Sequence, residues 1–104
     1  MCTPYRVMAK TISVDFEVFG TVQGVWFRKY TVQQARQLGL VGYCANTQKG
    51  TVQGRVQGPE CSIEVMKQWL STTGSPLSRI TTCRFSNEHE ISNPEYESFG
   101  VKHF

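Results

Sequence analysis

The sequence predicts an α+β sandwich in which an antiparallel sheet carries two helices on one face. Apolar and polar residues alternate strictly between Thr11 and Phe19, as in a half-buried strand. Two later segments, residues 27–38 and Glu60–Thr72, instead place apolar residues at helical spacing. Strand patterns flank both segments, and one pair of strands is joined by a very short turn. Strands mixed with helices and a hairpin indicate helices layered on a sheet.

The first strand is expected at Thr11–Phe19, where Ile12, Val14, Phe16 and Val18 occupy one face. Residues 1–10 are expected to form a flexible N-terminal arm. At this length, residues 11–104 are expected to form a single domain.

The first helix is expected over residues 27–38, and Gly39 is well placed to end it. Strands follow at Val41–Thr47 and Thr51–Gln57. The turn between them contains Gly50, which tolerates the positive φ that tight hairpin turns require. The two strands are therefore predicted to pair as an antiparallel hairpin.

The second helix is expected at Glu60–Thr72, followed by a strand at Arg79–Ser86. Apolar residues break strict alternation in that strand, which suggests a β-bulge. Asn87–Pro94 is expected to be a polar loop, and a weak strand follows within residues 96–101. The order β-α-β-β-α-β, with a short fifth edge strand, predicts a ferredoxin-like sandwich.

The composition is that of an ordinary globular domain with a net charge of +3. We expect no membrane partner, because no run of about 18 apolar residues occurs, and no signal peptide is evident. Four cysteines are spread along the chain without any Cys-x-x-Cys pair. They are interpreted as reduced thiols, which predicts a cytoplasmic protein.

The segment from Gly20 to Arg28 joins the first strand to the first helix and contains two glycines. Glycine lets consecutive backbone N–H groups turn toward one point, where they form an anion-binding concavity. The N-terminus of the following helix adds free N–H donors. Arg28 adds a planar, permanently charged group that suits two phosphate oxygens. The segment therefore has the parts of a phosphate-binding loop.

Two familiar nucleotide motifs are excluded for this loop. No Gly-Lys-Ser/Thr closes it, so it is not a Walker A loop, and its glycine spacing does not match a dinucleotide fingerprint. The loop alone leaves another interpretation open, in which the glycines turn the chain and Arg28 is merely solvated.

The titratable residues suggest a reaction that uses no protein nucleophile, metal or cofactor. No Asp or Glu pair has metal-site spacing, His89 and His103 are expected at the surface, and Cys44 is expected in the core. An acyl phosphate is reactive enough for positioning and charge stabilisation to suffice. Asn46 is the natural amide to hold a water, although by itself it could equally cap a turn.

Two long motifs resemble the signature of the acylphosphatase family. The first is Gly20-x-Val22-Gln23-Gly24-Val25-x-Phe27-Arg28. The second runs from Gly42 through Asn46-Thr47 and Gly50-Thr51-Val52-x-Gly54 to Gln57-Gly58-Pro59. Gly74-Ser75-Pro76 is similar to the family too, and the resemblance covers about residues 11–102.

This resemblance implies a ferredoxin-like fold and hydrolysis of the carboxyl–phosphate bond, which yields a carboxylate and inorganic phosphate. It implies that Arg28 binds the phosphate and that Asn46 orients the attacking water. It implies supporting roles for Gly20, Thr47 and Gly74. It also implies a phosphate cradle made by backbone N–H groups of Thr21, Val22, Gln23, Gly24, Val25, Trp26 and Phe27. Trp26, Tyr43, Cys44 and Ala45 depart from the family pattern and leave substrate preference open.

The main alternative is a non-catalytic phosphate- or RNA-binding module of the same fold. RNA binders of this kind stack bases on exposed aromatic residues of the central strands. The polar face of the predicted central strands has no aromatic residue among Ser13, Asp15, Glu17, Thr51, Gln53 and Arg55. We therefore expect a small-molecule acyl phosphate substrate, inorganic phosphate as product and competitive inhibitor, and no nucleic acid. Because no exposed apolar surface is evident, a monomer is expected.

Overall fold

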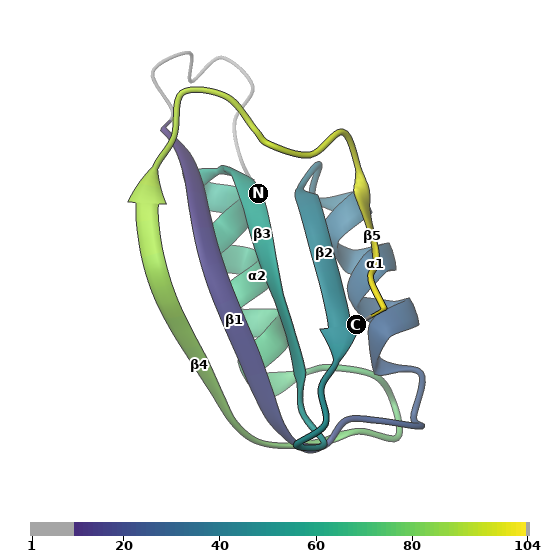
Figure 1. The fold of residues 1–104 in the computed structure, drawn as a ribbon. Coiled ribbons are helices and arrows are strands. Elements are labelled where there is room, and N and C mark those ends of the chain that lie inside the picture. The colour runs from purple at the N-terminus through teal and green to yellow at the C-terminus, as the bar shows by residue number, and fades with distance from the viewer. Residues whose placement is uncertain (1–9, 104) are drawn as a thin grey trace.

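A computed structural model describes residues 10–103, where five strands form one sheet and two helices cover one of its faces (Figure 1). The elements are β1 (Thr11–Thr21), α1 (Phe27–Gln37), β2 (Val41–Asn46), β3 (Val52–Pro59), α2 (Glu60–Thr72), β4 (Arg79–Glu90) and β5 (Phe99–Val101). The predicted ferredoxin-like α+β order and the layering are confirmed.

The sheet has the strand order β4-β1-β3-β2-β5. β1 pairs antiparallel with both β3 and β4, and β2 pairs antiparallel with β3 as the predicted hairpin. The short fifth strand lies at the edge as expected, but it pairs parallel to β2. A parallel pair needs a long connection, and the chain between β2 and β5 contains β3, α2 and β4. Residues 91–98 complete it by crossing from the β4 edge of the sheet to the β5 edge (Figure 1).

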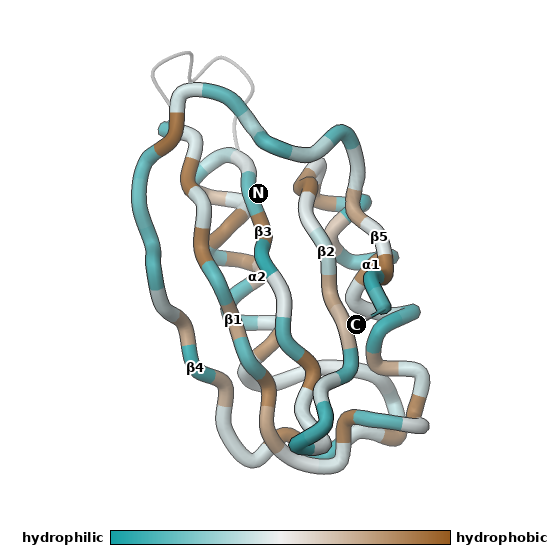
Figure 2. Tube along the Cα trace, viewed as in Figure 1, coloured by the Kyte–Doolittle hydropathy of each residue, from teal (hydrophilic) through white to brown (hydrophobic). Residues whose placement is uncertain are grey.

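The core lies between the sheet and the helices. Hydrophilic and hydrophobic residues alternate along β1 and β3 (Figure 2), which places one face of each strand against the helices. Fully buried side chains from both layers meet there: Val14, Val18, Val52, Val56, Ile63, Met66 and Leu70. Burial of this apolar face is the main stabilising contribution to the fold.

β4 is longer than predicted. The expected polar loop at Asn87–Pro94 begins only after Glu90, because His89 and Glu90 still pair with β1. Asn87 has a φ of 53°, and a register shift lies at this point. A second shift, which skips Thr81 between Ile80 and Thr82, is the bulge that the broken alternation suggested. The expected arm at residues 1–10 lies outside the described residues except for Lys10.

Among the cysteines of the described segment, Cys44 and Cys83 are free and Cys61 is disulfide-bonded. The interpretation of all four cysteines as reduced thiols is therefore wrong for Cys61. Within residues 10–103, no helix is long and apolar enough to cross a bilayer.

Candidate active site

The loop between β1 and α1 folds as an open turn with two left-handed residues. Gly24 has a φ of 75° and Trp26, at the N-cap of α1, has a φ of 65°. A left-handed residue beside right-handed ones turns successive N–H groups toward one side of the chain, the geometry of an anion-binding nest. Glycine adopts this φ without steric cost, whereas the Cβ of Trp26 makes the same conformation less favourable.

The backbone donors of this loop are available to a ligand. Within residues 10–103, no carbonyl or side chain accepts a hydrogen bond from the N–H groups of residues 23–29, and the first such donor of α1 is Tyr30, to Trp26. Unpaired donors at a helix N-terminus, together with the helix dipole, favour an anion.

Arg28 and Asn46 line the same cavity, which has a volume of about 450 Å³. Arg28 lies in the first turn of α1 and Asn46 is the last residue of β2. Val22, Gly24, Trp26 and Phe27 of the loop also line this cavity. The fold thus brings the Arg28 guanidinium, the Asn46 amide and the loop to one cavity, although Arg28 and Asn46 are far apart in the sequence.

The side chain of Asn46 is half-buried and holds an unused acceptor. Its Oδ1 atom is buried and has no hydrogen-bond partner among the described residues. A buried amide oxygen without a partner costs about 1–3 kcal/mol, so such atoms are rare in folded proteins. An acceptor in this position, in the same cavity as Arg28, fits a water molecule or a ligand that donates a hydrogen bond.

Gln23 links the loop to the turn that follows Asn46. Its Nε2 atom donates to the carbonyl oxygens of Thr47, at 2.8 Å, and Thr51, at 2.9 Å. The hydroxyls of Thr47 and Thr51 lie 2.6 Å apart, and Thr51 donates to Glu17. This network fixes the backbone on the C-terminal side of Asn46 relative to the loop.

The expected supporting residues Gly20, Thr47 and Gly74 lie around the site. Within residues 10–103, none of them donates a hydrogen bond to Oδ1 of Asn46. Thr47 contributes to the turn described above. Gly74 is buried with a φ of 62°, and a Cβ there would lie 2.7 Å from Phe27 Cε2. Gly20 pairs with Ile80 of β4 just before the loop. Thr47 is next to Asn46 in the chain, and Gly74 therefore lies against Phe27 of α1, the helix that carries Arg28.

Cys44 is buried in β2, behind the first turn of α1, with its Sγ atom 3.9 Å from the carbonyl oxygen of Arg28. Burial raises the pKa of this thiol to about 12, although the charge of Arg28 acts in the opposite direction. Because the thiolate is the reactive form, Cys44 is a core residue at neutral pH, as its sequence context indicated.

Three residues near the site were not predicted as site residues from the sequence. Lys29 and His103 line the cavity with Arg28 and Asn46, and His103 had been expected at the surface only. The buried Ser75 donates a hydrogen bond to the carbonyl oxygen of Val25 at 2.7 Å. The position of Lys29 directly after Arg28 was a usable signal, but nothing local indicated that the C-terminal segment returns to the loop.

Two large apolar side chains beside the loop are strongly exposed. Trp26 is 63% exposed and Leu77 is 74% exposed. The expectation that no apolar surface is exposed is therefore wrong at this place. In addition, no group of three or more His, Cys, Asp or Glu side chains gathers in residues 10–103 in a way that could hold a metal ion.

Comparison with known proteins shows the same family along most of the chain. A family model described as Acylphosphatase matches residues 14–101. Acylphosphatase-2 of Bos taurus is 58% identical over 91 residues, which are 88% of this chain and 92% of that protein. Acylphosphatase-2 of Homo sapiens is 57% identical over 91 residues, with 88% and 92% coverage.

Solved structures agree with the sequence relatives. An acylphosphatase from Coxiella burnetii superposes with a TM-score of 0.79 at 29% identity, covering 89% of this chain and 94% of that one. An acylphosphatase from Bacillus subtilis superposes with a TM-score of 0.80 at 27% identity, covering 88% and 98%. With its family match, its close relatives and its fold in agreement, this chain belongs to the acylphosphatase family.

Proposed function

We propose that this protein hydrolyses small acyl phosphates to a carboxylate and inorganic phosphate. The observation that carries this proposal is the buried, unpartnered Oδ1 atom of Asn46 in the same cavity as Arg28. A phosphoryl group needs a cationic and N–H-rich cradle, and its hydrolysis needs an oriented water. Membership of the acylphosphatase family agrees with both requirements.

In the proposed reaction, the phosphoryl oxygens accept hydrogen bonds from the Arg28 guanidinium and from the loop N–H groups of residues 21–27. A water molecule donates one hydrogen bond to Asn46 Oδ1 and directs a lone pair at phosphorus. The bond from water oxygen to phosphorus forms as the bond from phosphorus to the acyl oxygen breaks. The carboxylate leaves with the electron pair, and the protons of the water remain on phosphate.

The protein supplies positioning and charge in this scheme. Developing negative charge on the phosphoryl oxygens is stabilised by donors that are already in place, so they do not reorganise during the reaction. The carboxylate is stable as an anion and leaves without protonation by an acid. Inorganic phosphate fits the same cradle, so it is expected to inhibit competitively.

We also propose that the protein is a cytoplasmic monomer. The free thiols of Cys44 and Cys83 support that location, and the Cys61 disulfide counts against it. Cell fractionation tests the location, and size-exclusion chromatography with light scattering tests the oligomeric state. A measured mass of twice 11.8 kDa for the pure protein would contradict the monomer.

The alternative of a non-catalytic phosphate- or RNA-binding module is less well supported. On the face of the sheet away from the helices, the Nε atom of Arg55 lies 2.6 Å from Oδ1 of Asp15. Glu17 is two residues after Asp15 in the same strand, β1. Carboxylates on the central strands repel a nucleic-acid backbone, and the arginine charge there is already compensated. We therefore propose no nucleic-acid partner.

The test is phosphate release from acetyl phosphate, measured with and without excess EDTA. Full activity in EDTA is expected, because Arg28 and the loop N–H groups supply the positive charge in the proposed mechanism. Activity that is lost on chelation and restored by Mg²⁺ or Zn²⁺ would contradict the mechanism. No phosphate release from any acyl phosphate, by protein that still binds inorganic phosphate, would favour the non-catalytic module.

A further inference from the structure

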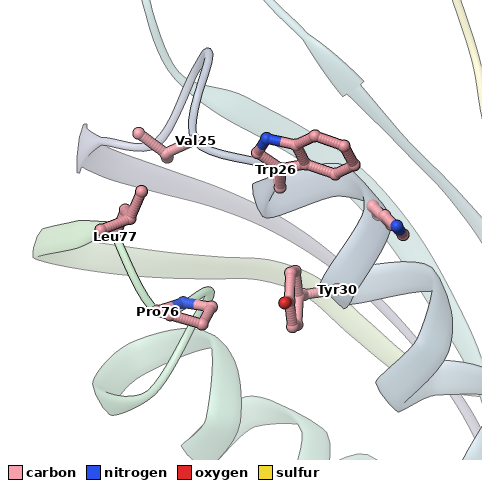
Figure 3. Close-up of a pocket in the computed structure, with 6 residues that line it drawn as sticks. Val25, Trp26, Tyr30, Pro76 and Leu77 are labelled. Atoms are coloured by element: carbon pink, nitrogen blue, oxygen red, sulfur yellow. The ribbon is translucent and has the colours of Figure 1, made fainter.

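Resting on the proposed function, we propose that a second cavity beside the phosphate loop is an acyl-group subsite, which selects acyl phosphates with an apolar aliphatic or aromatic acyl group. The cavity has a volume of about 320 Å³ and is lined by Val25, Trp26, Lys29, Tyr30, Pro76 and Leu77. Figure 3 shows Trp26 and Tyr30 on one side of this space, with Pro76 and Leu77 on the segment opposite. We call it the acyl pocket.

The acyl pocket adjoins the phosphate cavity. Trp26 and Lys29 line both spaces, so these two side chains stand at the border between the two cavities. The Nζ atom of Lys29 lies 4.5 Å from the centroid of the Trp26 ring, an arrangement that stabilises both exposed side chains where they are. One ligand can therefore occupy the phosphate loop and the acyl pocket together.

The orientation suits a leaving group. In-line transfer places the leaving oxygen on the side of phosphorus opposite the attacking water. Asn46, which is proposed to hold the water, lines the phosphate cavity and does not line the acyl pocket. An acyl group that points away from Asn46 and passes Trp26 enters the acyl pocket.

The far wall of the acyl pocket is fixed to the phosphate loop. Ser75 donates to Val25, and the backbone N–H and the hydroxyl of Ser78 both donate to the carbonyl oxygen of Ser75, at 3.0 and 2.7 Å. The segment with Pro76 and Leu77 is therefore held at a set distance from Trp26. A preformed wall costs little ordering free energy when a ligand binds.

The chemistry of the walls points to an apolar acyl group. Trp26, Leu77 and Tyr30 are all exposed although their side chains are largely apolar, at 63%, 74% and 37%. A ligand group that covers this surface removes it from water, which is favourable in proportion to the apolar area. An acetyl group is too short to reach far beyond the loop, whereas a butanoyl or benzoyl group covers part of these side chains.

The experiment compares kcat/KM for acetyl, butanoyl and benzoyl phosphate in the parent protein and in Leu77→Ala. We expect the parent to prefer the two larger substrates, and Leu77→Ala to lower the butanoyl-to-acetyl ratio about three- to tenfold. This is less than the roughly tenfold or more that one apolar group contributes in an enclosed pocket, because Leu77 is largely exposed. Leu77 is so exposed that its truncation does not threaten folding. The matched control is Val65→Ala, an exposed aliphatic residue on α2 that lines neither cavity.

The outcomes separate the two proposals. If the parent hydrolyses acetyl phosphate and shows no preference for larger acyl groups, or if Leu77→Ala leaves the ratio as it was, the acyl pocket is refuted and the proposed function stands. If no acyl phosphate is hydrolysed, the proposed function itself fails. A change of equal size in Val65→Ala would assign the effect to general stability and would also overturn the subsite.

Discussion

The Nε2 atom of Gln23 lies 2.8 Å from the carbonyl oxygen of Thr47, so the loop that leads to Arg28 is tied to the residue that follows Asn46. The same atom reaches Thr51. One amide group thereby joins the two halves of the proposed site. The distance between the phosphate loop and Asn46 therefore depends on a side chain that does not itself line the cavity.

We expect Gln23→Ala to lower kcat about ten- to a hundredfold, because small displacements of positioned groups are costly in catalysis. Phosphate affinity should change by less, since the loop N–H groups and Arg28 remain. The measurement is the inhibition constant of phosphate beside kcat for acetyl phosphate. Gln33→Ala, at an exposed glutamine of α1, is the control. Equal losses of affinity and kcat in Gln23→Ala would make Gln23 a structural residue of the loop.

Replacing Arg28 by lysine should keep the fold and nearly abolish activity. Lysine retains the charge but cannot present two parallel donors to two phosphoryl oxygens. A charged hydrogen bond contributes about 1.5–3 kcal/mol, so phosphate should bind roughly ten- to a hundredfold more weakly. Calorimetric titration with phosphate and a circular dichroism spectrum test this expectation. If Arg28→Lys turns over like the parent, the arginine only attracts the anion and does not hold it.

Asn46→Ala is expected to separate binding from chemistry. Phosphate affinity should stay within a few fold, whereas kcat should fall by about 10²–10³, as when one positioned polar group is removed from a preorganised site. Phosphate binding and turnover are measured on the same folded preparation. A parallel loss of both would identify Asn46 as a phosphate ligand, and unchanged turnover would leave it as a turn cap.

Glu17 should contribute to acid stability. Thr51 donates to its Oε2 atom at 2.6 Å, which together with Lys49 holds the pKa of this carboxyl below its ordinary value of 4.5, although burial acts in the opposite direction. A carboxyl with a lowered folded-state pKa stabilises the protein above its unfolded pKa, and this contribution is lost as the pH falls through the folded value.

A glutamine in place of Glu17 can still accept a hydrogen bond from Thr51, but without the negative charge. Glu17→Gln should therefore lower the free energy of unfolding at pH 7 by about 1 kcal/mol, the difference between a charged and a neutral hydrogen bond. Its stability should also change less than that of the parent as the pH falls below 4.5. Urea titrations at several pH values measure both effects. Glu97→Gln, at an exposed carboxylate, is the control and should follow the parent. A parallel pH profile for Glu17→Gln and the parent would remove Glu17 from the account of acid unfolding.

The spacing of apolar residues predicted the helices and strands that bury one face. The second helix was placed at Glu60–Thr72, as observed, because its apolar residues recur at helical spacing and a proline precedes it. The end of β4 could not be predicted in this way. Its last residues are polar and exposed at a sheet edge, and they extend the strand only because the distant β1 offers backbone partners.

The site also combines residues that local sequence patterns predict with residues that only the fold brings to it. Arg28 and Asn46 are predicted as site residues because they stand in two motifs that resemble a known family, and the glycine pattern around Arg28 carries physical meaning by itself. Lys29 and His103 join them through the fold, since the parallel pairing of β5 with β2 returns the end of the chain to the phosphate cavity. The acyl pocket likewise depends on Leu77, which is about fifty residues from Trp26 in sequence.

The return of the last strand to the cavity has a practical consequence for handling the protein. Val101 and His103 line the space that contains Arg28 and Asn46. A purification tag or fluorescent protein fused directly after His103 would therefore begin beside the cavity, where it can hinder substrate entry. A polyhistidine tag at that end would also place imidazoles and adventitious metal beside the phosphate loop. Kinetic comparisons among variants are best made on protein from which such an extension has been removed.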